Sequence, residues 1–517
     1  MSFAGDENGE VSILAHHVAD QISTAQPPVR HRGAAAIGDL FGHPKGLTFL
    51  FTTEMWERFS YYGMRSLLVL YMTKYLLLPG QAGDVVGLGG VKGALEAVFG
   101  PLAVQPLSSQ IWGFYTSLVY FTPILGGLLA DRVLGQRRTV VVGATLMAIG
   151  HFMMAVEQLF LFALLALILG NGAFKPNIST QVGGLYAPGD HRRDRAYSIF
   201  YVGINVGAFL APLICGTLGE KAGWHYGFAA AGVGMLIGLA IYLCALPLLP
   251  MDGFSGRSPS PERGGSDRQR RSGEGSGSAD VTPTRRPTVA DLPLSGGGER
   301  KPLSRDEWRG VAALLVLFVP TALFWATYEQ SGNTIVLWAD GYTDRSVGLF
   351  GAEIPTTWFL AFNPFMIFAF TPFVVALWSR QAARGTEPST VSKMALGCFG
   401  VALSYFMMAV AAWYAGAGKA GWSWLFVYFV VITVAELYLS PVGLSLVTKI
   451  APLRMLSMMM GVWLATSFVG SFLAGWLGSF WSRMEKPEFF LMIAAVAAIA
   501  GLAIFAARWP LRGMLSE

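Results

Sequence analysis

The chain has 517 residues, of which 53% are hydrophobic and only 13% are charged, and its mean hydropathy is +0.49. A typical soluble domain has roughly 25% charged residues, so this composition excludes an ordinary soluble protein and favours a polytopic membrane protein. The formal net charge of +5 reflects the placement of Lys and Arg around a membrane and does not indicate nucleic-acid binding.

The first half of the chain predicts a polar tail followed by six membrane spans. Residues 1–45 lack the apolar core of a secretory signal, so we expect a disordered N-terminal tail and a first span that serves as its own insertion signal. A bilayer core requires about 20 mostly apolar residues per helix. The expected spans are 46–78, 108–131, 139–157, 159–184, 194–217 and 227–250. The sequence leaves open whether the Gly-rich segment 79–107 contains a short surface helix.

The first span carries six polar side chains on one helical face, at positions i, i+3, i+4, i+7, i+8 and i+11. They are Glu54, Glu57, Arg58, Tyr61, Tyr62 and Arg65. A charged side chain at the centre of a membrane helix costs roughly 2.5–3.5 kcal/mol on insertion scales. The stripe must therefore face a hydrated cavity or partner charges, and it is the first predicted functional site.

The second span ends in GGLLADRVLGQRR at 126–138, which places Asp131, Arg132, Arg137 and Arg138 in a tight cytoplasmic turn. An acid and bases placed there can pair with helix ends in one conformation and separate in another. We therefore expect Asp131 and Arg132 to take part in gating. Anchoring by positive charge on the cytoplasmic side is the alternative interpretation.

Residues 251–304 are rich in Gly, Ser, Pro and Arg, with almost no apolar side chains. They cannot bury enough surface to offset chain entropy, so we expect a disordered cytoplasmic linker between two six-span halves, 46–250 and 305–510, with a C-terminal tail at 511–517. The later spans are 307–331, 354–380, 391–415, 421–450, 455–482 and 487–509. Two bundles joined in this way are typical of secondary transporters, whose substrate site lies between the halves.

The even number of spans places both chain ends on one side of the membrane. Most of the 37 Lys and Arg residues fall on that side, including Arg132, Arg192, Arg380 and Arg508. Because positive charge is concentrated in cytoplasmic loops, both ends are predicted to be cytoplasmic.

Three further charged residues lie deep in later spans: Lys175, Glu329 and Glu436. With the four charges of the first span they give four acids and three bases, divided between the halves. The net charge is −1 when every acid is ionised, and one proton makes it neutral, so a proton-coupling device is predicted. Structural ion pairs that clamp helices together are the disfavoured alternative, because buried ion pairs rarely add stability.

Several of these segments are similar to one transporter family. Residues 54–63, Glu-Met-Trp-Glu-Arg-Phe-Ser-Tyr-Tyr-Gly, resemble the E-x-x-E-R-F-x-Y-Y-G motif of the proton-dependent oligopeptide transporters (POT/PTR), and the Asp131–Arg132 turn resembles the signature of the major facilitator superfamily. Other similar blocks are FKPN at 174–177, FYVGINVGAFLAP at 200–212, FWATYEQ at 324–330, FNPF at 362–365 and ELYLSPVGLS at 436–445. The resemblance covers essentially all twelve spans. It implies an all-α major facilitator fold, with twelve helices in two six-helix bundles related by a pseudo-two-fold axis. Many bacterial members have two additional helices between the bundles, but 251–304 is too polar to supply them.

The resemblance also implies roles for individual residues in the proton-driven uptake of di- and tripeptides. Glu54, Glu57 and Arg58 match the proton-coupling motif, and Arg58 and Lys175 would hold the peptide carboxylate through charge-assisted hydrogen bonds. Glu436, with Asn205 and Asn363, is similar to the pocket for the peptide ammonium group. Arg65 and Glu329 resemble a gating pair between the halves and are also substrate-binding candidates. The remaining substrate-binding candidates are Tyr61, Tyr62, Tyr120, Trp325, Ser440 and Trp463.

The expected partners are di- and tripeptides, protons and the lipid bilayer of a plasma membrane, here a bacterial inner membrane, and the protein is expected to be monomeric. No metal or cofactor is expected, because Cys215, Cys244 and Cys398 are scattered without ligand spacing. We find no HExxH, GxSxG or P-loop motif of an enzyme. A carrier of the same fold for nitrate, another small anion or peptide-like drugs remains open, as does a receptor that does not transport. Glu436 favours a zwitterionic peptide over nitrate.

Overall fold

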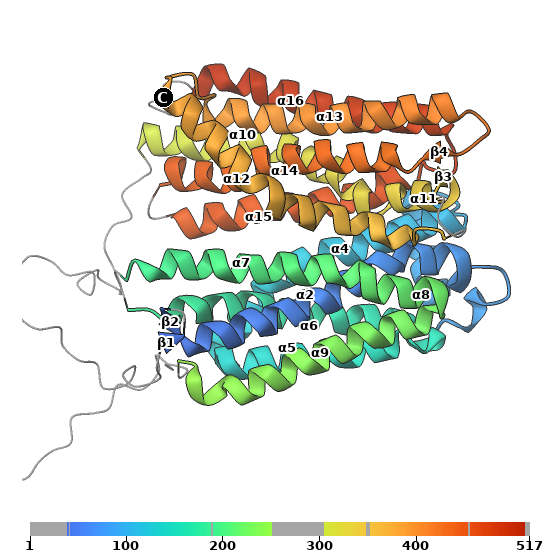
Figure 1. Ribbon diagram of the computed structural model, residues 1–517, viewed down its shortest axis with the longest axis horizontal. Coiled ribbons are helices and arrows are strands. Elements are labelled where there is room, and N and C mark those ends of the chain that lie inside the picture. The colour runs from blue at the N-terminus through green and yellow to red at the C-terminus, as the bar shows by residue number, and fades with distance from the viewer. Residues whose placement is uncertain are drawn as a thin grey trace, which may run out of the picture.

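The computed structural model describes residues 39–40, 42–187, 190–250, 304–347, 352–452 and 455–511. Apart from residues 39–40, 42–45, 304 and 511, the expected N-terminal tail, central linker and C-terminal tail lie outside these described residues. The described chain is almost entirely helical and contains twelve helices of 18 residues or more. Figure 1 shows the long helices running side by side in two groups, one from each half of the chain.

The first half contributes six long helices. They are α2 (Lys45–Tyr71), α4 (Val104–Leu129), α5 (Gln136–Met153), α6 (Phe160–Gly184), α7 (Arg192–Ala211) and α9 (Trp224–Ala245). An antiparallel pair of two-residue strands, β1 (Asp39–Leu40) and β2 (His43–Pro44), precedes them. The shorter helical segments are η1 (Met72–Leu76), η2 (Ala82–Asp84), α3 (Leu88–Phe99), η3 (Ala130–Leu134), η4 (Glu157–Leu159), η5 (Pro212–Gly216), α8 (Thr217–Lys221) and η6 (Leu246–Leu248). The segment 79–107 thus contains a helix of 12 residues, α3.

The second half also contributes six long helices. Its long helices are α10 (Arg305–Tyr328), α12 (Phe362–Ala383), α13 (Thr390–Ala415), α14 (Ser423–Ile450), α15 (Leu456–Gly478) and α16 (Lys486–Leu511). Shorter elements are η8 (Glu329–Gly332), α11 (Thr334–Gly341), η9 (Thr356–Ala361) and the paired strands β3 (Thr343–Asp344) and β4 (Ala420–Gly421). Helix α10 begins at a capping box, in which the Ser304 hydroxyl accepts from the Glu307 amide and the Glu307 carboxylate accepts from the Ser304 amide.

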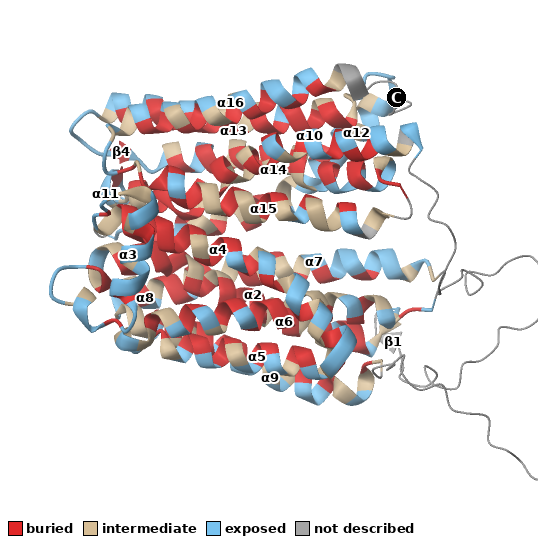
Figure 2. Ribbon diagram, turned by 180° about the vertical axis from the view of Figure 1, so that it is seen from behind, coloured by how far each residue is buried: buried red, intermediate tan, exposed pale blue. Residues whose placement is uncertain are grey.

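The surface of the long helices is suited to lipid. Within the described residues, ten helical stretches are long and apolar enough to cross a membrane, and the more polar α2 and α5 pack among them. Large apolar side chains are exposed along the helices, for example Phe373 at 74% and Val316 at 62%, while the faces turned toward neighbouring helices are buried (Figure 2). Such apolar exposure is unfavourable in water. The predicted all-α polytopic membrane protein is therefore confirmed.

Each half has its own apolar core. Leu67, Met147 and Phe174 belong to the core of the first half, and Tyr405 and Phe490 to that of the second. Small residues allow helices to approach closely within and between the halves. Helices α4 and α6 meet at Gly126 and Gly172, where a Cβ on Gly126 would overlap the backbone of Gly172. Helices α4 and α15 meet across the halves at Gly113 and Gly475.

We expect Gly126→Val to lower the thermal stability of the purified protein by several degrees, because overpacking a close contact costs about 1–3 kcal/mol. Gly127→Val is the matched control, since a Cβ at Gly127 meets no atom within 4 Å. The unfolding temperature of each variant is measured by heating the protein in detergent and monitoring the remaining folded fraction by size-exclusion chromatography. Equal losses of stability would contradict this description of the α4–α6 contact.

Candidate functional site

A cavity of about 330 Å³ lies between the two halves and is lined by side chains from both. The predicted substrate-binding residues that line it are Arg58, Tyr62, Arg65, Tyr120, Lys175, Asn205, Trp325, Glu329, Asn363, Glu436 and Ser440. The fold thus brings these residues, which are far apart in the sequence, to one cavity. The polar stripe of the first span predicted that such a cavity would be present.

Helix α2 and helix α6 position the acidic part of the stripe. Arg58 forms ion pairs with both neighbouring glutamates, with Nη2 2.6 Å from Glu57 Oε1 and Nε 3.3 Å from Glu54 Oε1. Asn171 on α6 donates a hydrogen bond to Glu57 at 3.2 Å. The two glutamates are buried and do not line the cavity, whereas Arg58 does. Arg58 therefore connects the cavity to the buried carboxylates. The proton-coupling role of these three residues stays a prediction.

Lys175, on α6, is the third base of the first half that lines the cavity, after Arg58 and Arg65. Its Nζ lies 5.5 Å from the centre of the Tyr120 ring, within the range of a cation–π interaction. Among the described residues, no carboxylate is within ion-pair distance of Lys175. Its charge therefore faces the cavity without a direct ionic partner.

Glu436, on α14, presents an acid from the opposite half. It accepts hydrogen bonds from the Tyr328 hydroxyl at 2.6 Å and from Asn363 Nδ2 at 3.0 Å. Asn363 is held in turn by Thr433, at 3.0 Å. In the described part of the chain, no Lys or Arg forms an ion pair with Glu436. Neutral donors thus orient this carboxylate and leave its charge uncompensated.

An ion pair between Arg65 and Glu329 joins the two halves at the cavity. The Arg65 guanidinium also lies 5.1 Å from the centre of the Trp112 ring. The ion pair belongs to a larger set of contacts between the halves at the end of the molecule that carries α8, α11 and η9, on the right in Figure 1 and called the closed end here.

Sequence reasoning missed two contacts at the closed end. Lys74 Nζ lies 2.7 Å from Asp340 Oδ1. Glu220, at the end of α8, accepts hydrogen bonds at 2.8 Å from the backbone amides of Thr356 and Thr357 and from the Thr357 hydroxyl. These two contacts fasten the first half to the second. Tyr201, which also lines the cavity, is 52% exposed, so the cavity is reached by solvent. We call the end opposite to these contacts, where α2 and α10 begin, the open end.

Other predicted residues do not line the cavity. Tyr61 and Trp463 are 4% and 6% exposed; Tyr61 packs on the Tyr62 ring at 5.2 Å between centres. Asp131 and Arg132 are exposed on η3, in the turn between α4 and α5. Their gating role stays a prediction.

Tyr201 and Tyr328 line the cavity but were absent from the predicted site. The spacing of Trp325, Tyr328 and Glu329 at i, i+3 and i+4 would have placed Tyr328 on the same helical face. Tyr201 similarly precedes Asn205 by four residues, and Asn205 Nδ2 donates to the Tyr201 carbonyl at 3.0 Å.

Two halves of six long helices that hold opposite charges at a shared cavity define a secondary membrane transporter. The chain belongs to the POT family, whose sequence model matches residues 137–255 and 298–494. Membership confirms the predicted family and major facilitator fold, and it places the chain among transporters rather than enzymes.

Individual members of the family are similar over nearly their whole length. The chain is 35% identical to "Peptide transporter YePEPT" of Yersinia enterocolitica subsp. palearctica serotype O:3 (strain YE-P4), over 85% of this chain and 88% of that protein. It is 32% identical to a "Di-/tripeptide transporter" of Lactococcus lactis subsp. cremoris, over 92% and 97%. Among crystal structures, the peptide transporter POT in complex with sulfate is 29% identical, with a TM-score of 0.75 over 94% of this chain and 98% of that one. A POT family transporter in complex with 5-aminolevulinic acid is 26% identical, with a TM-score of 0.73 over 92% and 98%.

We expect Glu220→Gln to increase the population of conformers that are open at the closed end. The substitution replaces charge-assisted hydrogen bonds, which contribute about 1.5–3 kcal/mol each, with weaker neutral ones. Double electron–electron resonance between spin labels at positions 221 and 419, after Cys244→Ser, should show a new long-distance component.

Glu353→Gln is the control for this measurement. The Glu353 side chain is 60% exposed and approaches Arg345 only to 3.7 Å, so its removal should leave the distance distribution unchanged. A Glu220→Gln distribution that matches that of the control would show that the Glu220 contacts do not hold this end shut.

Proposed function

We propose that the protein is a proton-coupled symporter that takes up di- and tripeptides by alternating access. The observation that carries the proposal is the pair of uncompensated charges, Lys175 from the first half and Glu436 from the second, at one cavity. A zwitterionic peptide has a carboxylate for Lys175 and an ammonium group for Glu436. The names of the similar Yersinia and Lactococcus proteins support the same substrate class.

The chemistry of the cavity disfavours the simplest alternative. Nitrate or another small anion would satisfy Lys175 but would leave Glu436 as a carboxylate without a cationic partner. A peptide-like drug that carries both charges would fit as a competing ligand. The cavity volume of about 330 Å³ is near the lower end of the roughly 300–1,000 Å³ typical of small-molecule sites, which supports short peptides.

The contacts of Arg58 supply a route for proton coupling. Arg58 divides its charge between Glu54 and Glu57 while it also faces the cavity. A peptide carboxylate that approaches Arg58 competes with these glutamates, and protonation of one glutamate removes that competition. Peptide and proton therefore favour each other's binding, and thermodynamic linkage makes the effect reciprocal.

We further propose a monomer in the plasma membrane, which for a bacterial host is the inner membrane, with both chain ends cytoplasmic. The excess of Lys and Arg on the side of the chain ends supports this orientation. The open end then faces the cytoplasm and the closed end faces outward. In this state the Arg65–Glu329, Lys74–Asp340 and Glu220 contacts separate the cavity from the exterior, and they must break before a new peptide enters.

Substitution of the two uncompensated charges should discriminate between the ends of the peptide. We expect Lys175→Gln to weaken binding of Ala-Ala at least about tenfold, as loss of one charge-assisted hydrogen bond implies, with little effect on Ala-Ala-amide. Glu436→Gln should instead weaken Ala-Ala and spare N-acetyl-Ala-Ala. Competition against labelled Ala-Ala in proteoliposomes measures each affinity.

Lys419→Gln is the matched control for these substitutions, because Lys419 is exposed in the loop beside β4, away from the cavity. Equal losses of affinity for free and capped peptides in the Lys175 and Glu436 variants would refute the assignment of the two termini.

Glu57→Gln should separate binding from coupling. The amide keeps the size of the side chain but cannot take part in protonation, so we expect accumulation of Ala-Ala on a proton gradient to be abolished. Exchange of labelled for unlabelled peptide across the membrane should persist, because it requires no net proton movement. Accumulation at the wild-type level on a proton gradient alone would exclude Glu57 from coupling.

A further inference from the structure

The charged cavity between the halves is lined by different kinds of side chain on its different sides. Helices α2, α4 and α6 contribute three bases, two tyrosines and one serine to it, and none of their described residues adds an aliphatic side chain. Every aliphatic side chain that lines the cavity, in the described part of the chain, belongs to α7 with η5 or to η9 with α12. These residues, called the aliphatic wall here, are Ile204, Ala208, Pro212, Leu360, Pro364 and Ile367.

The aliphatic wall consists of one stripe from each half of the protein. On the first half the stripe runs from Ile204 to Pro212 with a spacing of i, i+4 and i+8. On the second half it runs from Leu360 to Ile367 with a spacing of i, i+4 and i+7. Residues at such intervals lie on one face of a helix, so each stripe presents a continuous apolar surface to the cavity.

Two contacts bring the stripes together. The ring centres of Phe209 on α7 and Phe365 on α12 lie 5.8 Å apart, and each ring directly follows a residue of the aliphatic wall. The Thr357 hydroxyl of η9 donates to the Pro212 carbonyl at 3.3 Å. The two stripes therefore form one surface that crosses the boundary between the halves.

The carboxylate of Glu436 lies beside this surface. Asn363, which donates to Glu436 at 3.0 Å, directly precedes Pro364 of the aliphatic wall. Ile367 follows Asn363 by one helical turn, and it packs in one apolar cluster with Leu437. The proposed site for the peptide ammonium group thus borders the aliphatic wall, whereas the bases for the carboxylate come from α2 and α6.

A dipeptide that is held by its two charged ends presents its two side chains to different surroundings. The ammonium nitrogen is bonded to the Cα of the first residue, so the first side chain must lie close to the group that binds the ammonium. In an extended backbone, successive side chains point to opposite sides. The first side chain therefore lies at the aliphatic wall, and the second points away from it.

We propose that the aliphatic wall binds the side chain of the first peptide residue and makes the transporter prefer dipeptides whose first residue is aliphatic, an inference that rests on the proposed function. A leucine at this position exchanges contact with water for contact with apolar side chains, which is favourable. A serine at this position loses hydrogen bonds to water, which is unfavourable when no partner replaces them.

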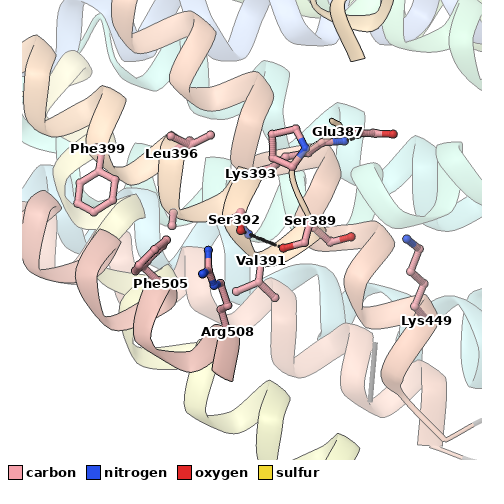
Figure 3. A pocket seen from close by; sticks show the side chains of 13 residues that line it. Glu387, Ser389, Val391, Ser392, Lys393, Leu396, Phe399, Lys449, Phe505 and Arg508 are labelled. Carbon is pink, nitrogen blue, oxygen red and sulfur yellow. Dashed lines mark hydrogen bonds and ion pairs between the residues drawn. The ribbon is translucent and has the colours of Figure 1, made fainter. Parts of the chain in front are cut away.

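The larger cavity of the protein does not offer an alternative place for this side chain. It has a volume of about 770 Å³ and lies between the start of α13 and the ends of α14 and α16, as Figure 3 shows. None of the residues that line it lines the charged cavity. A peptide that is bound at Glu436 must therefore place its side chains within the charged cavity.

Two dipeptides of identical composition, Leu-Ser and Ser-Leu, test the proposal. Each competes against labelled Ala-Ala for uptake driven by a proton gradient into proteoliposomes that contain the full-length protein. We expect Leu-Ser to bind about tenfold more tightly than Ser-Leu, the gain expected when about half of a leucine side chain is buried. Equal affinities, or tighter binding of Ser-Leu, would overturn the proposal but leave the proposed function intact. If the wild type does not accumulate Ala-Ala, the proposed function fails as well.

Ile204→Thr and Ile367→Thr test the two stripes separately. Each should lower the ratio of the Leu-Ser affinity to the Ser-Leu affinity about fourfold, the effect of about one buried methylene group. The ratio cancels any general loss of binding, and size-exclusion chromatography confirms folding. Ile199→Thr is the matched control, because Ile199 is on α7, is 38% exposed and does not line the cavity. Ratios in both wall variants that equal that of the control would refute the assignment of the wall.

Discussion

Seven charged side chains, four of them buried and three half-buried, lie between two apolar helix bundles, and they are the constraint on which the rest of this structure depends. Two arrangements compensate most of them: Arg58 is shared by Glu54 and Glu57, and Arg65 pairs with Glu329 across the halves. The remaining two, Lys175 and Glu436, are held by an aromatic ring and by neutral hydrogen-bond donors. A charge in apolar surroundings is unfavourable without a partner, so the site is poised for a ligand that carries both signs.

The mechanical design follows from how the halves are fastened. Most of the buried apolar side chains of each half pack within that half, and Ala474 of α15 is one of the few that join the core of the other half. At the closed end, the halves are joined by polar contacts such as those of Glu220 and Lys74. Hydrogen bonds and ion pairs of this kind can be exchanged for contacts with water at small net free energy, which allows rocking between states.

Much of this could be predicted from residue patterns, and the failures have physical causes. The long apolar runs and the 3.6-residue period of the polar stripe on α2 specify helices and a cavity-facing side, and motif resemblance placed Lys175, Glu329 and Glu436. The contacts of Glu220 with η9 and of Lys74 with Asp340 join residues more than a hundred positions apart in connecting segments without periodicity. Tyr61 and Tyr62 are adjacent in sequence, yet the 100° turn per residue of a helix places only Tyr62 on the cavity. Helices α3 and α11 are too short to leave a clear hydrophobic signal.

The capping box at Ser304 and Glu307 also has a meaning for engineering. Because these two residues satisfy each other's backbone groups, the start of α10 is stabilised by residues within the second half and does not depend on the residues before Ser304. The two halves of the chain can therefore be treated as separate units in protein engineering. Reporter domains, protease sites or even a break that divides the polypeptide into two co-expressed pieces can be introduced ahead of residue 304, and the assembled carrier becomes a scaffold for sensors.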